Sequence, residues 1–363
     1  MELLRRILAQ PTVAFCEQAV AAEVYRWADE AGFSVEADRV GNLKLVYSRG
    51  RKKTRWVVHA HMDHPGFVTT RRRGSEVWCE FRGGVHEEYF VGSRVRFLAA
   101  AGDVCGTVET MRMDSKTRFR HCRVKLDESA AVAPGDLGVW DVPAVRRRGK
   151  FVEARACDDL ACVAASLAML ERLAAEKRNA HVTVWLTRAE EVGFGGTLSA
   201  MAAGSLDRKA WYIGLECSKA MPAAKIGDGV AIRVGDRLMS FDPELGYDLV
   251  KVAQQLATDD KKFHYSRALM DSGGTETSAL VSAGYRAAAL ALPLGNYHNM
   301  GPKDTIAAER IAYDDYCAMV TLLTEMVSRP TSPATSAQEL KKALAQHEKT
   351  LRPYWKESPI CLQ

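Results

Sequence analysis

The sequence predicts an α/β fold: a doubly wound, largely parallel sheet with helices on both faces and a small inserted all-β, barrel-like domain. After residue 150, strand-like and helical segments alternate along the chain, which is typical of a parallel sheet covered by helices. Between about residues 70 and 150, short β-like runs separated by Gly, Asp and Pro replace this alternation, which indicates a barrel or sandwich. A length of 363 residues accommodates both modules.

The individual elements are predicted from hydrophobic spacing. Residues 1–31 carry apolar side chains at helical intervals. Residues 33–47 are typical of a β-hairpin with Gly41-Asn42 near its turn, and a short strand follows at 55–60. The later elements are predicted in this order: helix 160–175, strand 181–186, a helix from 196, strand 210–215, helix 245–256, a helix from 275, strand 287–292 and helix 311–327.

These elements predict three regions. The main α/β domain comprises residues 1–70 and 150–328, and the inserted β domain comprises residues 71–149. Residues 329–363 form a C-terminal linker and helical tail, because 328–336 are rich in Pro, Ser and Thr and 338–351 form a charged helix. We expect this tail to pack on the surface or on a neighbouring subunit and to carry no chemistry.

The composition argues against nucleic-acid and membrane partners. The chain has 50 Lys and Arg against 45 Asp and Glu, so its net charge of +5 is small for its length. Arginine clusters at 71–73 and 146–148 are interpreted as solvated turns, with a substrate or subunit contact as the alternative. No apolar run approaches the roughly 20 residues that span a bilayer, and the N-terminus lacks a signal-peptide core. Nine scattered cysteines without a C-x-x-C pair predict reduced thiols and a cytoplasmic location.

Five residues of the kinds that bind metals each follow a hydrophobic run: His61, Asp158, Glu191, Glu216 and His298. If these runs are parallel strands, their carboxyl ends converge on one crevice. Two imidazoles and three carboxylates there can hold two divalent metal ions. Glu190 is left as a general base for a metal-activated water, and Asp63 can place a carboxylate behind the His61 imidazole. The set therefore predicts a hydrolase.

Each of these residues also has a structural interpretation when taken alone. The pair Asp158-Asp159 could cap a helix, the two adjacent glutamates could form a solvated turn, and either histidine could be a buried core residue. Asp159 could cap the following helix or orient Asp158, and the sequence does not choose between these roles. The occurrence of all five residues in this order favours the metal site.

Other residues could compete for these roles. His59 lies two residues before His61 and could replace it as a ligand, but a buried strand histidine is the expected role. Cys157 and Cys217 adjoin candidate ligands and are expected to be small buried fillers. Two histidines of the insert are interpreted as exposed loop residues, with a reach into a neighbouring active site as the alternative: His86 and His121.

Over about residues 10–327 the chain resembles the co-catalytic zinc aminopeptidases of the glutamyl aminopeptidase and tetrahedral aminopeptidase type. The resemblance is carried by Gly41-Asn42-Leu43, His61-Met62-Asp63 with Gly66-Phe67, Pro134-Gly135-Asp136, Asp158-Asp159, Glu190-Glu191-Val192-Gly193, Gly273-Gly274-Thr275, and Pro293 ahead of His298. The insert falls within the 97 positions (158 − 61) that separate His61 from Asp158, as in this aminopeptidase group. Carboxypeptidase and deacylase relatives place their extra domain before the last histidine, where only 82 positions (298 − 216) are available here.

The resemblance implies specific roles. One metal ion would be held by His61, Asp158 and Glu216, and the other by Glu191, His298 and the bridging Asp158. Both ions would be divalent, with zinc expected and cobalt or manganese as alternatives. The insert would act as a lid and subunit contact in a homo-oligomer, from a dimer up to a dodecamer.

The chain departs from the family pattern at four places. His64 follows His-Met-Asp where the family usually has Glu, Glu216 stands in place of the usual Asp, and Glu276 follows Gly-Gly-Thr in place of Asp. The run before His298 is Gly295-Asn296-Tyr297. Because Asp and Glu are both hard oxygen donors, the metal site should tolerate these changes. We expect the changed positions to lie near the substrate.

The expected function is removal of N-terminal residues from peptides by metal-activated water. One alternative is a metal-dependent carboxypeptidase or deacylase acting on N-acyl amino acids or dipeptides, which Glu216 suggests. A second alternative is a non-catalytic assembly protein that retains the fold, against which the intact Glu190 argues.

Overall fold

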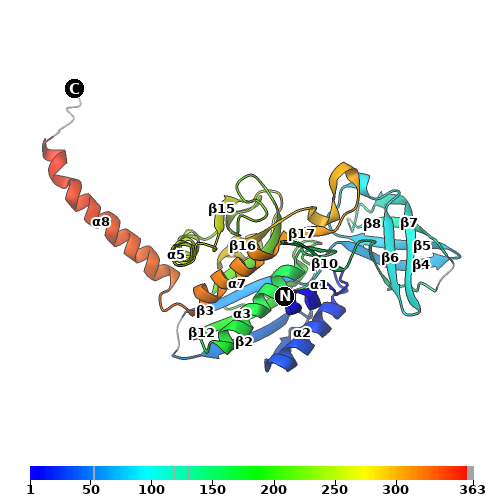
Figure 1. Ribbon diagram of the computed structural model, residues 1–363, viewed down its shortest axis with the longest axis horizontal. Coiled ribbons are helices and arrows are strands. Elements are labelled where there is room, and N and C mark those ends of the chain that lie inside the picture. The colour runs from blue at the N-terminus through cyan, green and yellow to red at the C-terminus, as the bar shows by residue number, and fades with distance from the viewer. Residues whose placement is uncertain (52–53, 118, 129–130, 358–363) are drawn as a thin grey trace.

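The protein has a central α/β body with a β-barrel at one end and a projecting helix at the other (Figure 1). The computed structural model describes residues 1–51, 54–117, 119–128 and 131–357. None of the helices in these ranges is long and apolar enough to cross a membrane.

The body is built on an eight-stranded mixed sheet whose centre is parallel. The central strands β12, β3, β13 and β16 run parallel to one another, whereas β2 and β14 on either side pair antiparallel with them. In spatial order the strands are β1 (Val35–Ala37), β2 (Leu43–Arg49), β12 (Ala180–Thr187), β3 (Arg55–His61), β13 (Trp211–Lys219), β16 (Arg286–Leu294), β14 (Val230–Gly235) and β15 (Tyr265–Leu269).

Helices cover both faces of this sheet, which confirms the predicted fold class. Strand β3 alternates between two cores, since Trp56 and Val58 join the larger core and Val57 joins the smaller one. The larger core is covered by α1 (Glu2–Leu8), α2 (Gln18–Ala31), α3 (Leu160–Ala175), α5 (Pro243–Asp259) and α7 (Tyr313–Ser328). The smaller core is covered by α4 (Gly195–Ala202) and α6 (Glu276–Ser282). Helix α3 forms over the predicted residues from strong helix formers, and most of its residues are buried.

The insert is a closed six-stranded antiparallel barrel, as the sequence predicted. Its strands in spatial order are β4 (Gly66–Arg73), β5 (Glu76–Arg82), β8 (Arg120–Leu126), β7 (Gly102–Met113), β6 (Arg94–Ala99) and β9 (Leu137–Trp140). The interior is aromatic: the Phe67 ring lies 4.8 Å from those of Phe81 and Trp140, edge to face. The barrel therefore has a core of its own, separate from that of the body.

A three-stranded sheet joins the barrel to the body. It consists of β10 (Val145–Arg148), β11 (Phe151–Ala154) and β17 (Glu309–Ala312). The barrel strands thus end at Trp140, and β10, which the sequence placed in the insert, pairs with strands outside it. The predicted helix from 311 was wrong at its start, because Ile311 and Ala312 pair with β11 before α7 begins.

The C-terminal tail is a single long helix, α8 (Pro333–Glu357). It begins within the segment predicted as a linker, and proline is well tolerated in the first turn of a helix. Its base is fixed to α5, where the buried Asp248 accepts hydrogen bonds from Arg329 and Ser336. Lys251 of α5 also pairs with Glu339 at 2.9 Å. The rest of α8 points away from the body (Figure 1).

We predict that Asp248→Ala lowers the free energy of unfolding by about 2–3 kcal/mol, because it leaves two donors without their buried acceptor. Glu339→Ala removes only an exposed ion pair and should cost less than about 1 kcal/mol. Urea unfolding of both variants measures the difference. Equal losses in the two variants would show that Asp248 does not anchor the tail.

Candidate metal centre

The candidate ligands meet at the carboxyl ends of the central strands. His61 ends β3, Glu216 lies in β13, Glu191 follows β12, and His298 follows β16 in the short 3-10 helix η2 (Tyr297–Asn299). Asp158 is the exception. It follows β11 of the small joining sheet, so the expectation that each ligand follows a strand of one sheet was wrong for this residue.

The five side chains form two groups that share Asp158. In the first group, His61 Nε2 lies 3.3 Å from Asp158 Oδ1 and 3.8 Å from Glu216 Oε1. In the second group, His298 Nε2 lies 3.1 Å from Glu191 Oε1 and 3.5 Å from Asp158 Oδ2. The donor atoms of each group lie within 4.8 Å of one another. The two oxygens of Asp158 therefore face different groups.

The donor set fits two divalent metal ions. Asp158 Oδ1 and Glu191 Oε1 are buried and accept no hydrogen bond from the described residues, although buried polar atoms normally have a partner. Both atoms belong to the groups that could hold an ion. Carboxylate oxygens and imidazole nitrogens are ligands for zinc, manganese and cobalt.

Both imidazoles are oriented with Nε2 toward the carboxylates. Nδ1 of His298 donates to the carbonyl oxygen of Gly84 in the barrel, and Nδ1 of His61 lies 3.2 Å from the carbonyl oxygen of Asp63. Burial opposes charge on both rings, but the surrounding carboxylates outweigh it and raise the pKa of His61 and His298 well above the usual value. The site therefore attracts positive charge.

Asp63 fixes the loop that carries the two glutamates. Its Oδ1 accepts the backbone N–H of Glu190 at 2.9 Å, and its Oδ2 accepts that of Glu191 at 3.0 Å. It also lies behind His61, with Oδ1 3.5 Å from Nδ1. Asp63 itself is fully buried and does not line the cavity beside the candidate ligands.

Glu17 and Asn42 support the same loop from the other side. Glu17 Oε1 accepts the N–H of Ala189 at 3.0 Å, and its Oε2 accepts Nε of Arg188 at 2.7 Å. Asn42 accepts the N–H of Arg188 and donates to the carbonyl of Gly196. Sequence reasoning missed Glu17, because these contacts span more than 170 positions and leave no local pattern.

Glu309 was also missed, and it connects two ligands through their backbones. Its carboxylate accepts the N–H of Asp158 at 2.9 Å and that of His298 at 2.7 Å. Burial, and then the charge of Asp158, raise its pKa well above the usual value. The residue lies in β17, a strand that the sequence did not predict.

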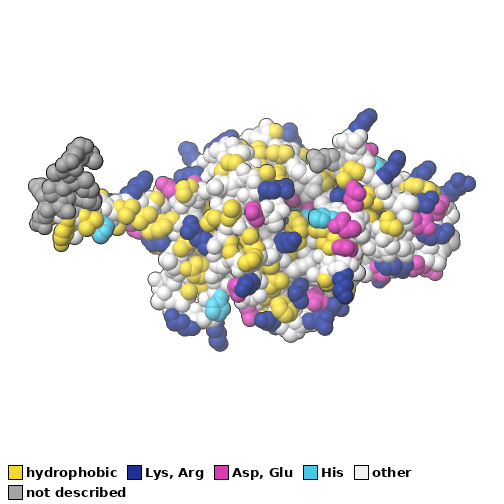
Figure 2. Space-filling model, turned by 90° about the horizontal axis from the view of Figure 1, so that it is seen from above, with side chains coloured by type: hydrophobic (Ala, Val, Ile, Leu, Met, Phe, Trp, Pro, Cys, Tyr) yellow, Lys and Arg dark blue, Asp and Glu magenta, His cyan; other side chains and the backbone are white. Residues whose placement is uncertain are grey.

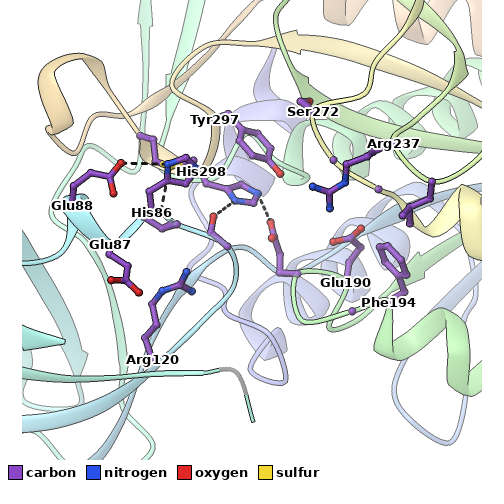
Figure 3. A pocket seen from close by; sticks show the side chains of 18 residues that line it. His86, Glu87, Glu88, Arg120, Glu190, Phe194, Arg237, Ser272, Tyr297 and His298 are labelled. Atoms are coloured by element: carbon purple, nitrogen blue, oxygen red, sulfur yellow. Dashed lines mark hydrogen bonds and ion pairs between the residues drawn. The ribbon is translucent and has the colours of Figure 1, made fainter. Parts of the chain in front are cut away.

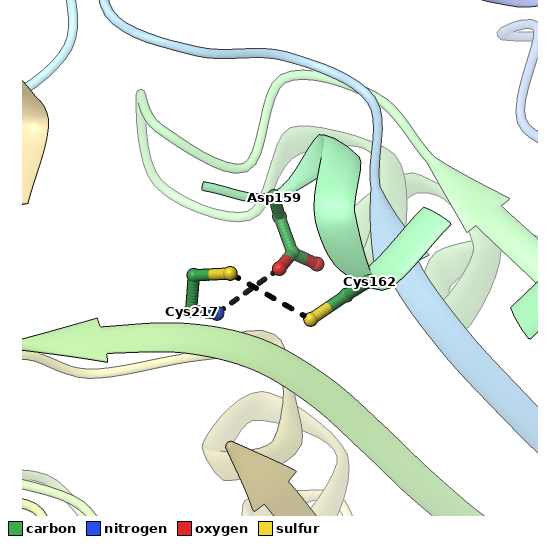
Figure 4. Close-up of side chains that lie close together, drawn as sticks. All are labelled: Asp159, Cys162 and Cys217. Atoms are coloured by element: carbon green, nitrogen blue, oxygen red, sulfur yellow. Dashed lines mark hydrogen bonds between the residues drawn. The ribbon is translucent and has the colours of Figure 1, made fainter. Parts of the chain in front are cut away.

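Asp159 and two cysteines form a third cluster, which supports the first group of ligands (Figure 4). Asp159 Oδ1 accepts the N–H of Cys217 at 3.0 Å, and Oδ2 accepts that of His61 at 3.3 Å. Although these donors lie close enough together to hold an ion, both oxygens are already used by backbone N–H groups. Burial raises the pKa of the Cys162 and Cys217 thiols, whose sulfurs lie 3.9 Å apart. These contacts leave the thiols as neutral, buried packing groups.

The suggested roles of Asp159 need correction. It precedes α3, but its side chain makes no capping hydrogen bond. Its carboxylate holds β3 and β13 near their metal-type residues and does not contact Asp158 through a hydrogen bond that could orient it. The physical reason is that two buried backbone donors of neighbouring strands need an acceptor there.

Two of the changed family positions are buried behind the ligands and do not line the cavity. His64 contacts the carbonyl oxygen of Asp158 through Nδ1 and Asn299 through Nε2. Glu276 accepts hydrogen bonds from Thr187 and Thr197 and lies 3.5 Å from His59. His64 and Glu276 were expected to lie near the substrate, and this expectation was wrong.

A cavity of about 600 Å³ opens beside the second group. The body contributes Glu190, Glu191 and His298 to its lining. The barrel contributes the opposite wall, with Gly84, His86, Glu87, Glu88 and Arg120. In Figure 3, Glu190 and Arg237 face the cavity from one side and Arg120 from the other. Figure 2 shows acidic side chains and a histidine gathered where the barrel meets the body.

Glu190 has different surroundings from the adjacent Glu191. It belongs to neither ligand group, yet it is largely buried and lines the cavity. Burial raises its pKa well above the usual value, His61 lowers it, and the nearby carboxylates raise it further.

The two histidines of the insert lie in different places. His86 lines the same cavity, whereas His121 is half-buried in β8 beside Asp114.

The chain belongs to the M42 glutamyl aminopeptidase family, whose model matches residues 41–322. Membership makes it a metallo-aminopeptidase by class, in agreement with the resemblance noted in the sequence. The comparison with curated proteins gave no match.

Solved structures share the fold at low identity. An aminopeptidase from the archaeon Desulfurococcus kamchatkensis is 20% identical, with a TM-score of 0.75, and the match covers 92% of this chain and 96% of that one. A TET aminopeptidase from a marine sediment archaeon of the Thaumarchaeota is 19% identical, with a TM-score of 0.74 and coverage of 91% and 96%. The TET1 peptidase of Pyrococcus horikoshii, which can assemble into a tetrahedron or a large octahedral shell, is 19% identical, with a TM-score of 0.73 and coverage of 90% and 98%.

We predict that the protein binds two divalent ions per chain and that Asp158→Asn weakens both sites. The loss should exceed the roughly 10–100-fold typical of residues that only support a ligand. Glu216→Gln should weaken one site and leave the other intact. Titration calorimetry with zinc measures this, and Cys162→Ser serves as the control that keeps both sites. Two unweakened sites in Asp158→Asn would contradict the shared carboxylate.

Proposed function

We propose that this protein removes N-terminal residues from peptides with water activated between two divalent metal ions, and that Glu190 is the general base. One observation carries the proposal. Asp158 turns one oxygen to each ligand group, and Glu190 lies in the adjoining cavity without belonging to either group. A paired-ion site with a free carboxylate beside it suits hydrolysis by activated water.

The ligand residues divide between the two ions. His61, Asp158 and Glu216 would hold one ion, and Asp158, Glu191 and His298 would hold the other. Bound divalent ions supply Lewis acidity, which polarises a peptide carbonyl and makes water more acidic. Zinc is the proposed ion, with cobalt or manganese as alternatives that suit the same donors.

Glu190 performs the proton transfers in this proposal. Its carboxylate takes a proton from the attacking water and passes it to the amine that leaves when the peptide bond breaks. Asp63 acts through Glu190 and Glu191 by holding their backbone N–H groups in place. The N-terminal amine of the substrate would lie near Glu216, whose side chain is 12% exposed.

A rival specificity is a carboxypeptidase or deacylase, suggested by the glutamate at 216. The family match favours the aminopeptidase. The position of the insert also favours it, because the barrel that forms one wall of the cavity lies between His61 and Asp158 in the chain, as the resemblance to the aminopeptidase group implies. The non-catalytic alternative is disfavoured by the cavity beside Glu190.

We also propose a homo-oligomer, from a dimer up to a dodecamer, acting on peptides in the cytoplasm. The self-assembly of the Pyrococcus horikoshii TET1 peptidase supports the oligomer. The described cysteines are all free, which suits a reducing compartment.

Glu190→Gln should lower kcat on an aminoacyl-anilide by about 10²–10⁴-fold, because the general base is lost while the ligands remain. Metal content, measured by mass spectrometry, should stay at the wild-type value. Glu88→Gln, at the barrel side of the same cavity, is the control and should keep most of the activity. An unchanged kcat in Glu190→Gln would remove Glu190 from the mechanism.

A substrate panel separates the two specificities. We expect hydrolysis of peptides and anilides with a free N-terminal amine and no hydrolysis of the same compounds after N-acetylation, because the amine is part of what the site recognises. Rates on both sets are measured with the metal-loaded enzyme. Hydrolysis of the acetylated set alone would establish the deacylase in place of the aminopeptidase.

A further inference from the structure

The tail helix α8 presents a surface that the body leaves uncovered. Within the part of the tail whose burial the structure describes, Ala337 is the last buried residue, and every residue from 338 to 354 is exposed. This segment lies beyond the part of the chain that matches the family, which ends at residue 322. Figure 2 shows the helix projecting from the body with hydrophobic side chains along it. In proteins, most of the stability of a helix comes from the packing of an apolar face against a partner.

The exposed segment has the spacing of a coiled-coil seam. Its larger apolar side chains and one histidine recur at alternating intervals of four and three residues: Leu340, Leu344, His347, Leu351 and Tyr354. Leu344 and Tyr354 are 60% and 64% exposed, and Leu340 and Leu351 are each 38% exposed. We call these five residues the tail seam. Alternate spacing of this kind places the side chains along one stripe, where they pack into a facing helix.

We infer that the tail seam pairs antiparallel with the tail seam of a second copy of this chain. In an antiparallel pair, alternate seam positions face each other, so Leu344 meets His347 of the partner and Leu340 meets Leu351 of the partner. Each contact occurs twice, because the pair is symmetric. The result is four consecutive layers without a gap.

Charge complementarity selects the antiparallel orientation. Lys341 and Glu348 each follow a seam residue and flank the seam on the same side. In the antiparallel pair described above, Lys341 lies beside Glu348 of the partner, and the reverse contact is its symmetric copy. In a parallel pair, the residues that face these two charges are Ser336 and Ala343, which are uncharged. Flanking charges set the orientation and partner choice of such helices.

Each heptad contributes two layers, so four layers amount to about two heptads, fewer than the three to four heptads of an independent coiled coil. The pair would therefore work beside other contacts in a homo-oligomer, where a tethered second contact gains from its high effective concentration. The first turns of α8 are attached to α5 by the Ser336–Asp248 hydrogen bond and the Lys251–Glu339 ion pair, which orient the seam relative to the body.

The test is hydrogen–deuterium exchange of residues 340–354 in the full-length protein, with sedimentation velocity over a range of concentrations. In the wild type, we expect these amides to be protected in a concentration-dependent way. Leu344→Asp should speed their exchange by at least about tenfold by removing two buried leucines per pair. Ala345→Asp, on the opposite face of the same helix, should leave exchange and association unchanged.

Charge reversal tests the register and the partner together. Lys341→Glu should speed exchange by about tenfold, because two attractions become repulsions. The double variant Lys341→Glu/Glu348→Lys should restore protection to near the wild-type rate. Glu348 also pairs with Arg352 of its own helix at 2.9 Å, so Arg352→Gln is the control for losing that internal contact.

Three results would overturn the inference. The first is a tail that exchanges rapidly at every concentration, and the second is protection that does not depend on concentration. The third is protection that Leu344→Asp abolishes but the double charge reversal fails to restore, which would assign the seam to the body or to a different protein. Peptidase activity measured in parallel verifies that the variants remain folded, because the tail lies far from the cavity.

Discussion

The structure depends on one buried carboxylate, that of Asp158, whose two oxygens each need a positively charged partner. Asp158 is almost fully buried and directs its two oxygens to different histidines. An isolated buried charge is costly unless it is paired, so the surrounding elements must deliver positive charge to each oxygen. The parallel strands, the loop after β12 and the turn after β16 all end where this can be done. Elements from separate parts of the chain therefore converge on Asp158.

Around Asp158, other buried acidic residues accept hydrogen bonds from the backbone and are not among the candidate metal ligands themselves. Asp63, Asp159 and Glu309 each accept two backbone N–H groups from segments that carry candidate ligands. Such contacts fix the position of a side chain through its own backbone, which is stiffer than a side-chain contact alone. The acidic residues of the site are therefore of two kinds: candidate metal ligands, and residues that hold the ligand-carrying segments in place.

The sequence predicted the parts of this structure that rest on local periodicity. Helix α3 and the central strands have regular apolar spacing, and the five metal-type residues could be found because they follow such runs. Strand β17 could not, since Ile311 continues the apolar pattern of α7 and only its pairing with β11 makes it a strand. Glu17 and Glu309 were missed for a similar reason. The partners of Glu17 lie 171 and 172 positions away and Asp158 lies 151 positions from Glu309, and no local sequence pattern indicates such contacts. The fold class was therefore accessible from sequence, whereas the scaffold behind the ligands was not.

The contact between Gly84 and His298 has a consequence for the barrel. A loop of the barrel supplies the carbonyl oxygen that orients this imidazole. The barrel therefore positions a candidate ligand in addition to forming one wall of the cavity. Removing the barrel would release a ligand in addition to opening the cavity. Variation in this protein would then be tolerated on the outer strands and turns of the barrel, while the short stretch that reaches His298 has to keep its path.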